Sequence, residues 1–138
     1  MTGSGLFIIL ITGDNISMKV CIAGSRGFCD YDSLCKVMKH AFGDKQIIII
    51  SGHARGADSL GELFARENHL QLEIYPADWT TYGKGAGHIR NAKMASISDC
   101  LVAFWDGESR GTKNMINNMK RLGKPVLVYN YITNTYEK

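Results

Sequence analysis

Four short segments of this 138-residue sequence combine glycine with side chains that can hold an anion. Glycine lets the backbone approach a ligand closely, and the arginine guanidinium matches the geometry of a phosphate or carboxylate. This combination predicts phosphate binding. The candidate ligand-binding residues are Gly24, Ser25, Arg26, Gly52, Arg55, Gly56, Asp58, Lys84, Arg90, Asn91, Trp105, Ser109, Gly111 and Thr112.

The first segment, residues 24–28, is short and has two interpretations. It follows an apolar run and contains Arg26 between two glycines, as expected for a loop that holds an anion. It matches neither the dinucleotide-binding nor the Walker A glycine pattern. A tight turn with a solvent-exposed Arg26 explains the same residues, and this segment alone does not decide between the two.

The second segment, residues 51–58, again joins small residues to charged ones. Arg55 is placed to meet an anion, and we expect Asp58 in the first turn of a helix. There its carboxylate either hydrogen-bonds a ribose hydroxyl or simply caps the helix. We interpret His53 as a loop donor or a solvated side chain and not as a metal ligand.

The third segment, residues 82–91, carries three glycines and predicts a mobile loop that folds over a bound group. A helix is expected from about residue 89 to 97, with Arg90 and Asn91 in its first turn. Arg90 is the preferred ligand contact. For Lys84 and Lys93 a solvated basic face is the alternative that we favour, although Lys84 stays among the candidates.

The fourth segment, residues 104–112, runs directly into a predicted helix. Free backbone N–H groups and the hydroxyls of Ser109 and Thr112 then converge on one place, as in many phosphate sites. Trp105 either stacks on a base or fills the edge of the core, which is the default for an aromatic residue that ends a strand. Asp106 and Glu108 are carboxylates near this helix start, although exposed turn carboxylates are usually only solvated. The catalytic candidates of the whole sequence are Arg90, Asp106 and Glu108.

Short apolar runs that alternate with amphipathic stretches must position these four segments. Such alternation predicts an α/β domain with a parallel sheet covered on both faces. We predict a three-layer Rossmann-like fold with five parallel strands in the order 3-2-1-4-5. Ligands bind such sheets beyond the carboxyl ends of the strands, where the strand order reverses. The predicted strands are 19–23, 47–50, 72–75, 100–105 and 126–129.

The composition limits the function classes. Hydrophobic residues make up 45% of the chain and charged residues 21%, which excludes extensive disorder. The formal charge of +3 is too small to indicate nucleic-acid binding by itself. The four cysteines form no C-x-x-C pair and lie at no zinc-finger spacing from a histidine, so we predict no metal, no cofactor and reduced cytoplasmic thiols.

Residues 1–17 are interpreted as an N-terminal appendage, with an extra edge strand as one alternative. The apolar run of residues 7–11 is far shorter than the ~20 residues that span a bilayer, and no basic residue precedes it. We predict a single domain over residues 18–138, with no membrane contact and a cytoplasmic location.

From residue 18 to about 131 the sequence resembles the YspA-like branch of the SLOG superfamily, named for the Smf/DprA and "lonely guy" (LOG) proteins. The resemblance implies a Rossmann-like fold and a pocket for a nucleotide or a nucleotide-derived ligand. It further implies a bacterial or phage protein that senses or sequesters that ligand. The segments that match are 23–28, 51–58, 76–79, 82–91 and 103–112.

Two other activities follow from the resemblance. LOG-type enzymes cleave the N-glycosidic bond of nucleoside monophosphates, and Gly111, Thr112 and Arg90 match their pattern. Their glutamate one turn later is missing, because residues 113–115 are Lys, Asn and Met. A phosphoribohydrolase is therefore the alternative to a binding protein.

DprA-like binding of single-stranded DNA ranks third. It needs a positive groove with serial aromatic side chains, whereas Trp79, Tyr82 and Trp105 are scattered along this sequence. The resemblance also implies self-association as a homo-oligomer, for which Met115, Met119 and the apolar run of residues 7–11 are candidate contacts.

Overall fold

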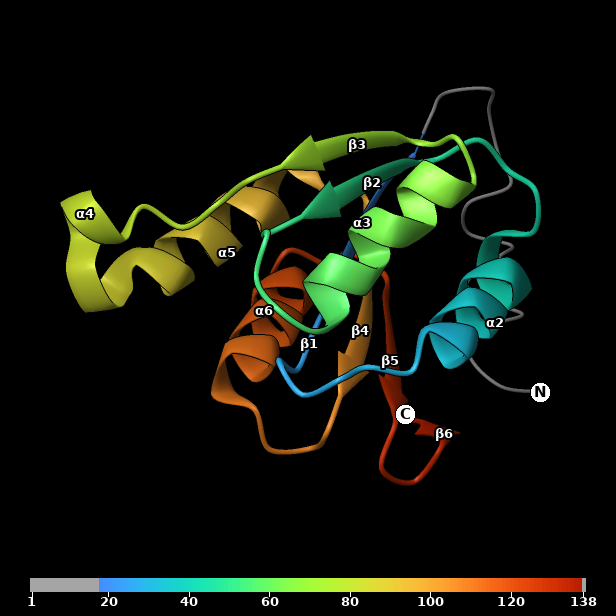
Figure 1. The fold of residues 1–138 in the computed structure, drawn as a ribbon. Helices are drawn as coiled ribbons and strands as arrows, with labels where there is room; N and C mark the ends of the chain where they lie inside the picture. The colour runs from blue at the N-terminus through green and yellow to red at the C-terminus, as the bar shows by residue number, and fades with distance from the viewer. Residues whose placement is uncertain (1–17, 138) are drawn as a thin grey trace.

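The fold is a six-stranded sheet in the order β3-β2-β1-β4-β5-β6, seen in a computed structural model that describes residues 18–137 (Figure 1). Strands β1 to β5 are parallel, which confirms the predicted order 3-2-1-4-5. A short sixth strand, which the sequence did not predict, pairs antiparallel with β5. The strands are β1 (Lys19–Gly24), β2 (Ile48–Ser51), β3 (Gln71–Ile74), β4 (Cys100–Trp105), β5 (Val126–Asn130) and β6 (Thr135–Tyr136).

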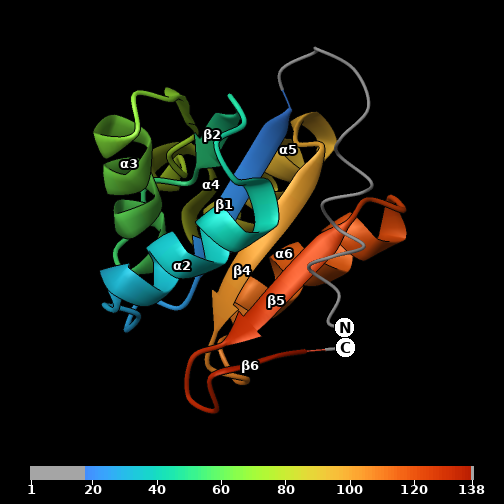
Figure 2. The ribbon, with the colours of Figure 1, turned by 90° about the vertical axis from the view of Figure 1, so that its right-hand side faces the viewer.

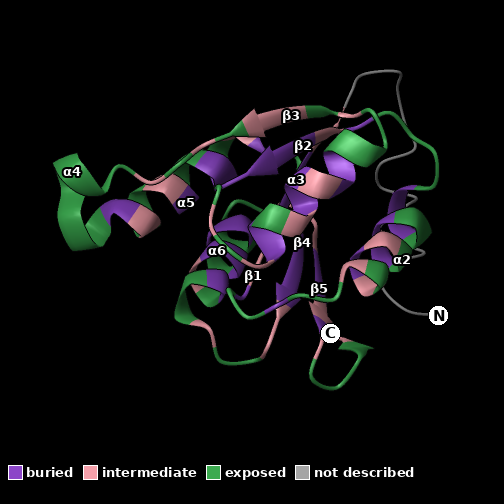
Figure 3. Ribbon diagram, in the orientation of Figure 1, coloured by how far each residue is buried: buried purple, intermediate pink, exposed green. Residues whose placement is uncertain are grey.

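Two hydrophobic cores lie on opposite faces of the sheet. In β1, Val20 and Ile22 point into one core while Cys21 and Ala23 point into the other, because successive strand residues face opposite sides. Helices α2 (Tyr31–Phe42) and α3 (Ala57–Glu67) cover the first face, and α5 (Ala86–Ile97) and α6 (Arg110–Arg121) cover the second (Figure 2). Burial on both faces is typical of a parallel sheet, and the central strands are accordingly buried (Figure 3).

Helix α2 shows how local sequence sets the helix ends. The carboxylate of Asp30 accepts a hydrogen bond from the Ser33 N–H at 3.1 Å and caps the first turn. Gly43, with φ 60°, ends the helix.

The prediction of a mobile loop at residues 82–88 is wrong, because this stretch is mainly helical. Asp78 caps a short helix, α4 (Trp79–Tyr82), through the Thr81 N–H at 3.1 Å. A 3₁₀ turn over residues 83–85 then leads into α5, which begins at Ala86. Arg90 therefore lies in the second turn of α5 and not in the first.

The structure contradicts one expectation about contacts with other molecules. Met115 and Met119 are 1% and 0% exposed, because they pack against the sheet, and they are unavailable to a second protomer. The apolar run of residues 7–11, like the whole proposed appendage, lies outside the described residues. Within residues 18–137, no helix is both long enough and apolar enough to cross a membrane.

Candidate functional site

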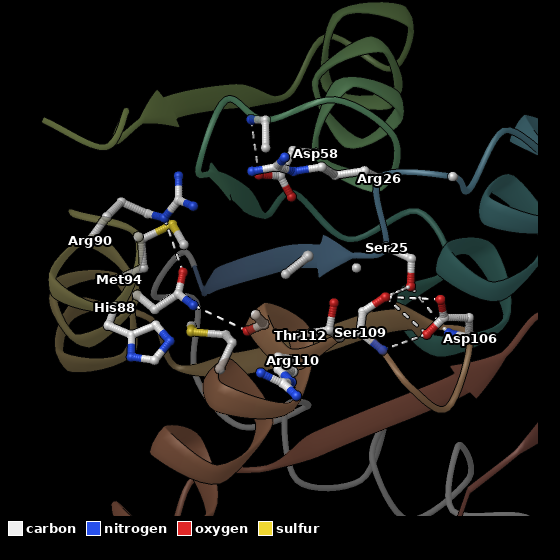
Figure 4. A pocket seen from close by; sticks show the side chains of 18 of the residues that line it. Ser25, Arg26, Asp58, His88, Arg90, Met94, Asp106, Ser109, Arg110 and Thr112 are labelled. Carbon is white, nitrogen blue, oxygen red and sulfur yellow. Dashed lines mark hydrogen bonds between the residues drawn. The ribbon is translucent and has the colours of Figure 1, made fainter. Parts of the chain in front are cut away.

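A cavity of about 530 Å³ opens beyond the carboxyl ends of β1 and β4, where the strand order reverses. The loops after both strands, together with α3, α5 and the start of α6, form its walls (Figure 4). Most of the predicted ligand-binding residues line this one cavity: Gly24, Ser25, Arg26, Asp58, Lys84, Arg90, Asn91, Ser109, Gly111 and Thr112.

The start of α6 is open toward the cavity. Lys113 N–H already bonds the Ser109 carbonyl, but the N–H groups of residues 110–112 have no protein acceptor among the described residues. The Thr112 side chain is 5% exposed, and its hydroxyl likewise has no partner within residues 18–137. Three N–H donors and one hydroxyl therefore remain free at the positive end of a helix.

The Ser109 hydroxyl, which stands at the N-cap position of α6, does not cap the helix. It lies 2.9 Å from both carboxylate oxygens of Asp106 and 2.9 Å from the Ser25 hydroxyl (Figure 4). The Asp106 N–H in turn donates to the Ser25 hydroxyl at 3.2 Å. This network joins the loop after β1 to the loop after β4 and leaves the helix start uncapped.

Asp106 serves this network as an ionised acceptor. Partial burial raises its pKa, but hydrogen bonds from the backbone N–H groups of Ser109 and Glu108 and from the Ser109 hydroxyl outweigh burial and leave the pKa below its ordinary value. A carboxylate with filled acceptor positions and a low pKa is a poor proton donor. Its role in the structure is to position Ser109.

Arg90 is held in place by two of its donors. Its Nε donates to Asn91 Oδ1 at 3.0 Å and its Nη1 donates to the Gly52 carbonyl. A Cβ atom at Gly52 would lie 2.6 Å from Arg90 Nη1, so glycine is needed for this approach. The amide of Asn91 also donates to the Gly111 carbonyl at 3.2 Å and to Asn114 Oδ1 at 3.1 Å. Arg90 is thus coupled to the start of α6.

Asp58 is a buried carboxyl group in the cavity wall. Its side chain is 6% exposed, and one carboxylate oxygen accepts a hydrogen bond from the Ala54 N–H at 3.1 Å. Burial raises the pKa of Asp58 to about 6, against the opposing effects of the Ala54 N–H and the Arg90 charge. Asp58 is therefore the carboxyl group of the cavity that is closest to exchanging protons near neutral pH.

Five predicted site residues lie outside the main cavity. Gly52 and Arg55 line a neighbouring cavity. Gly56 faces neither cavity, because the backbone of Ser25 and Arg26 packs against it. Trp105 packs against the core and donates to the Ser109 carbonyl at 3.0 Å. The exposed side chain of the catalytic candidate Glu108 also lines neither cavity.

The sequence reasoning missed several residues that line the cavity: Trp79, Gly87, His88, Met94, Arg110, Met115 and Tyr131. The position of Arg110, directly after Ser109, was a usable signal. Trp79 lies in a segment that matches the SLOG pattern. Tyr131 follows β5 and reaches the cavity only through the fold, so no local pattern could have found it.

Sequence comparison finds a match to the model of the YspA, cpYpsA-related SLOG family over residues 18–82. The chain is also similar to the Gene 61 protein of Mycobacterium phage D29, with 32% identity over 120 residues that cover 79% of this chain and 94% of that protein.

Structural comparison finds the X-ray structure of DNA processing protein A (DprA) from Streptococcus pneumoniae, with a TM-score of 0.67. The match covers 81% of this chain, and this chain spans half of the DprA chain. At 18% identity this likeness shows a shared Rossmann-like fold. The sequence segments, the strand order and these matches together identify the chain as a member of the YspA, cpYpsA-related SLOG family.

Proposed function

We propose that the main cavity binds a nucleotide or a nucleotide-derived ligand through a phosphate group at the start of α6. The observation that carries this proposal is the set of free donors there, namely the N–H groups of residues 110–112 and the Thr112 hydroxyl. A phosphate accepts several hydrogen bonds at once and is favoured at the positive end of a helix.

The charges around α6 support the same proposal. Helices α2 and α4 begin with a capping aspartate, Asp30 and Asp78. Helix α6 has no side-chain cap and no acidic residue in its first turn, and it carries Arg110 and Lys113 there instead. Positive side chains at a helix start are unfavourable unless an anion binds beside them.

The rest of the cavity suits the sugar and the base. We infer that Asp58 accepts hydrogen bonds from ribose hydroxyls, because the carboxylate lies in the wall beside Arg90. Trp79 is 53% exposed at the cavity rim and offers a flat surface for a base. The volume of about 530 Å³ lies within the usual range for small-molecule sites. Binding of this kind is what a protein that senses or sequesters a nucleotide requires.

Isothermal titration calorimetry with the 5′-monophosphates of adenosine, guanosine, cytidine and uridine tests the proposal. We expect at least one monophosphate to bind and its parent nucleoside to bind far more weakly. Thr112→Val keeps the shape of the side chain but removes a hydrogen bond to a charged group, so the affinity should fall about 10- to 100-fold.

Thr81→Val is the matched control, because Thr81 is exposed on α4 and lines no cavity described above. Its affinity should equal that of the unmodified protein. The phosphate site would be disproved if Thr112→Val bound the monophosphate as tightly as this control.

A second candidate function, cleavage of the N-glycosidic bond of a nucleotide, is favoured by Asp58 alone. A buried carboxyl group with a pKa of about 6 has the environment of a group that takes part in glycoside hydrolysis. Against it, Met115 lines the cavity one turn after Thr112, where LOG-type enzymes carry their glutamate. The binding function therefore ranks first.

Chromatography of released base separates the two functions. If the chain only binds nucleotides, incubation with the same four monophosphates should release no base above the rate without protein. Base release that disappears in Asp58→Asn, while monophosphate binding persists, would establish the hydrolase instead.

A further inference from the structure

A second cavity of about 420 Å³ adjoins the main cavity and is strongly cationic. Its walls carry Arg26, Arg55, Arg90 and His53, and no carboxylate is among its lining residues. The two cavities meet along a shared wall, which is formed by Arg26, Ala54, Trp79 and Arg90. Arg55 and His53 line the second cavity alone.

The arginines of this cavity are not used up by acidic partners. Within residues 18–137, none of Arg26, Arg55 and Arg90 forms an ion pair, and only Arg90 has hydrogen bonds within the chain. Among the described residues, Arg26 and Arg55 have no carboxylate within ion-pair distance, and Arg90 feels only the more distant charge of Asp58. Neighbouring guanidinium groups repel one another, and binding of an anion reduces that repulsion. A planar guanidinium group can also donate two parallel N–H···O hydrogen bonds to two oxygen atoms of one phosphate.

His53 is held toward this cavity by buried groups. Its backbone has φ 62°, a left-handed conformation that costs a non-glycine residue about 1–3 kcal/mol. Its N–H donates to the Ser51 hydroxyl at 3.1 Å, and its Nδ1 lies 2.9 Å from the carboxylate of Glu62, which is 4% exposed. The other ring nitrogen, Nε2, has no partner among residues 18–137. A strained residue held by buried partners is typical of a binding site.

We propose that this second cavity is an anion subsite, so that the ligand class is a nucleotide with two phosphoryl groups. One group binds at the start of α6, and the other binds among Arg55, Arg26 and His53. The sugar lies between them, beside Arg90, which lines both cavities, and Asp58, which lines the main cavity. This inference rests on the proposed function and adds a second phosphoryl group to the ligand.

Calorimetry with a matched pair of ligands tests the subsite. The probes are adenosine 5′-monophosphate and adenosine 3′,5′-bisphosphate, each titrated into the full chain. We expect the bisphosphate to bind about 10- to 100-fold more tightly. Arg55→Ala should remove most of this advantage and leave the affinity for the monophosphate unchanged, because Arg55 lines only the second cavity.

Arg121→Ala is the charge-matched control, since Arg121 lies at the far end of α6 and lines neither cavity. Arg55→Lys, which keeps the charge but not the planar donor pair, should restore only part of the advantage. If the monophosphate binds but the bisphosphate gains nothing, or if Arg55→Ala weakens both ligands equally, the second subsite is wrong and the proposed function stands.

A crystal soak covers the case in which neither probe binds. Selenate stands in for phosphate, and its anomalous signal should appear at two positions, one at the start of α6 and one against Arg55. A signal at α6 alone overturns the subsite, whereas a signal at Arg55 alone overturns the phosphate site of the proposed function and leaves the subsite in place.

Discussion

Gly56→Ala should lower the free energy of unfolding by about 3–5 kcal/mol, a large part of the stability of an ordinary domain. Gly56 has φ 76°, and an added Cβ atom would lie 2.3 Å from the Ser25 carbonyl oxygen and 2.5 Å from that of Arg26. These neighbours are backbone atoms that cannot rotate away. The loop after β1 must therefore move, and the cavity wall that it forms must move with it.

Gly123→Ala is the matched control for this change. Gly123 has φ 70°, but an added Cβ atom would meet nothing within 4 Å. The control carries only the left-handed strain, about 1–2 kcal/mol. Urea denaturation followed by circular dichroism measures both variants. Equal losses for Gly56→Ala and Gly123→Ala would show that the loop after β1 yields freely and that the close packing at Gly56 is unimportant.

Asp58→Asn should stabilise the protein by about 2–3 kcal/mol at pH 7, because burial raises the pKa of Asp58 from 3.8 to about 6. A raised pKa in the folded state means that folding disfavours the ionised form. The stabilising contribution of the protonated form is complete below pH 3.8 and is lost as the pH rises through about 6. The asparagine side chain is neutral throughout and can still accept from the Ala54 N–H.

The difference in unfolding free energy between Asp58→Asn and the unmodified protein should therefore be near zero at pH 4 and grow to its full size by pH 7. Urea denaturation at several pH values measures it. Asp44→Asn, at an exposed position outside both cavities, should show no such growth. A constant difference across this pH range would mean that Asp58 is not desolvated. A gain in stability at the cost of ligand affinity is expected for a site residue.

The fold could be predicted because its strands have strong local signals. The run of isoleucines in β2 and the apolar residues of β1 and β4 are buried on both faces, so each strand stands out in the sequence. Strand β6 has two residues and pairs only with the end of β5, and such a short element leaves no pattern of its own.

The prediction of a mobile loop at residues 82–88 was wrong because glycine occurs both in loops and in helical conformations. Gly85 and Gly87 accept ordinary helical or near-helical conformations here, and only Gly83 of this stretch has a positive φ. The Asp78 cap starts helical structure before the glycines are reached. Composition alone could not show that a neighbouring cap decides the outcome.

The candidate site was predictable in outline, since glycine and arginine follow several strands at the same edge of the sheet. Which residues share a cavity was not predictable, because this depends on packing. Gly56 and Trp105 belong to the packing that supports the cavity walls, and Arg55 lies in the neighbouring cavity. Tyr131 arrives from the far end of the chain.

Hydrogen bonds among Ser25, Ser109 and Asp106 join the loop after β1 to the loop after β4. They fix the two loops against each other during folding, and Ser25 is only 2% exposed as a result. This part of the cavity wall therefore loses its conformational entropy during folding and not during ligand binding. A ligand that binds as proposed would meet an already ordered surface and would retain more of its contact energy as affinity.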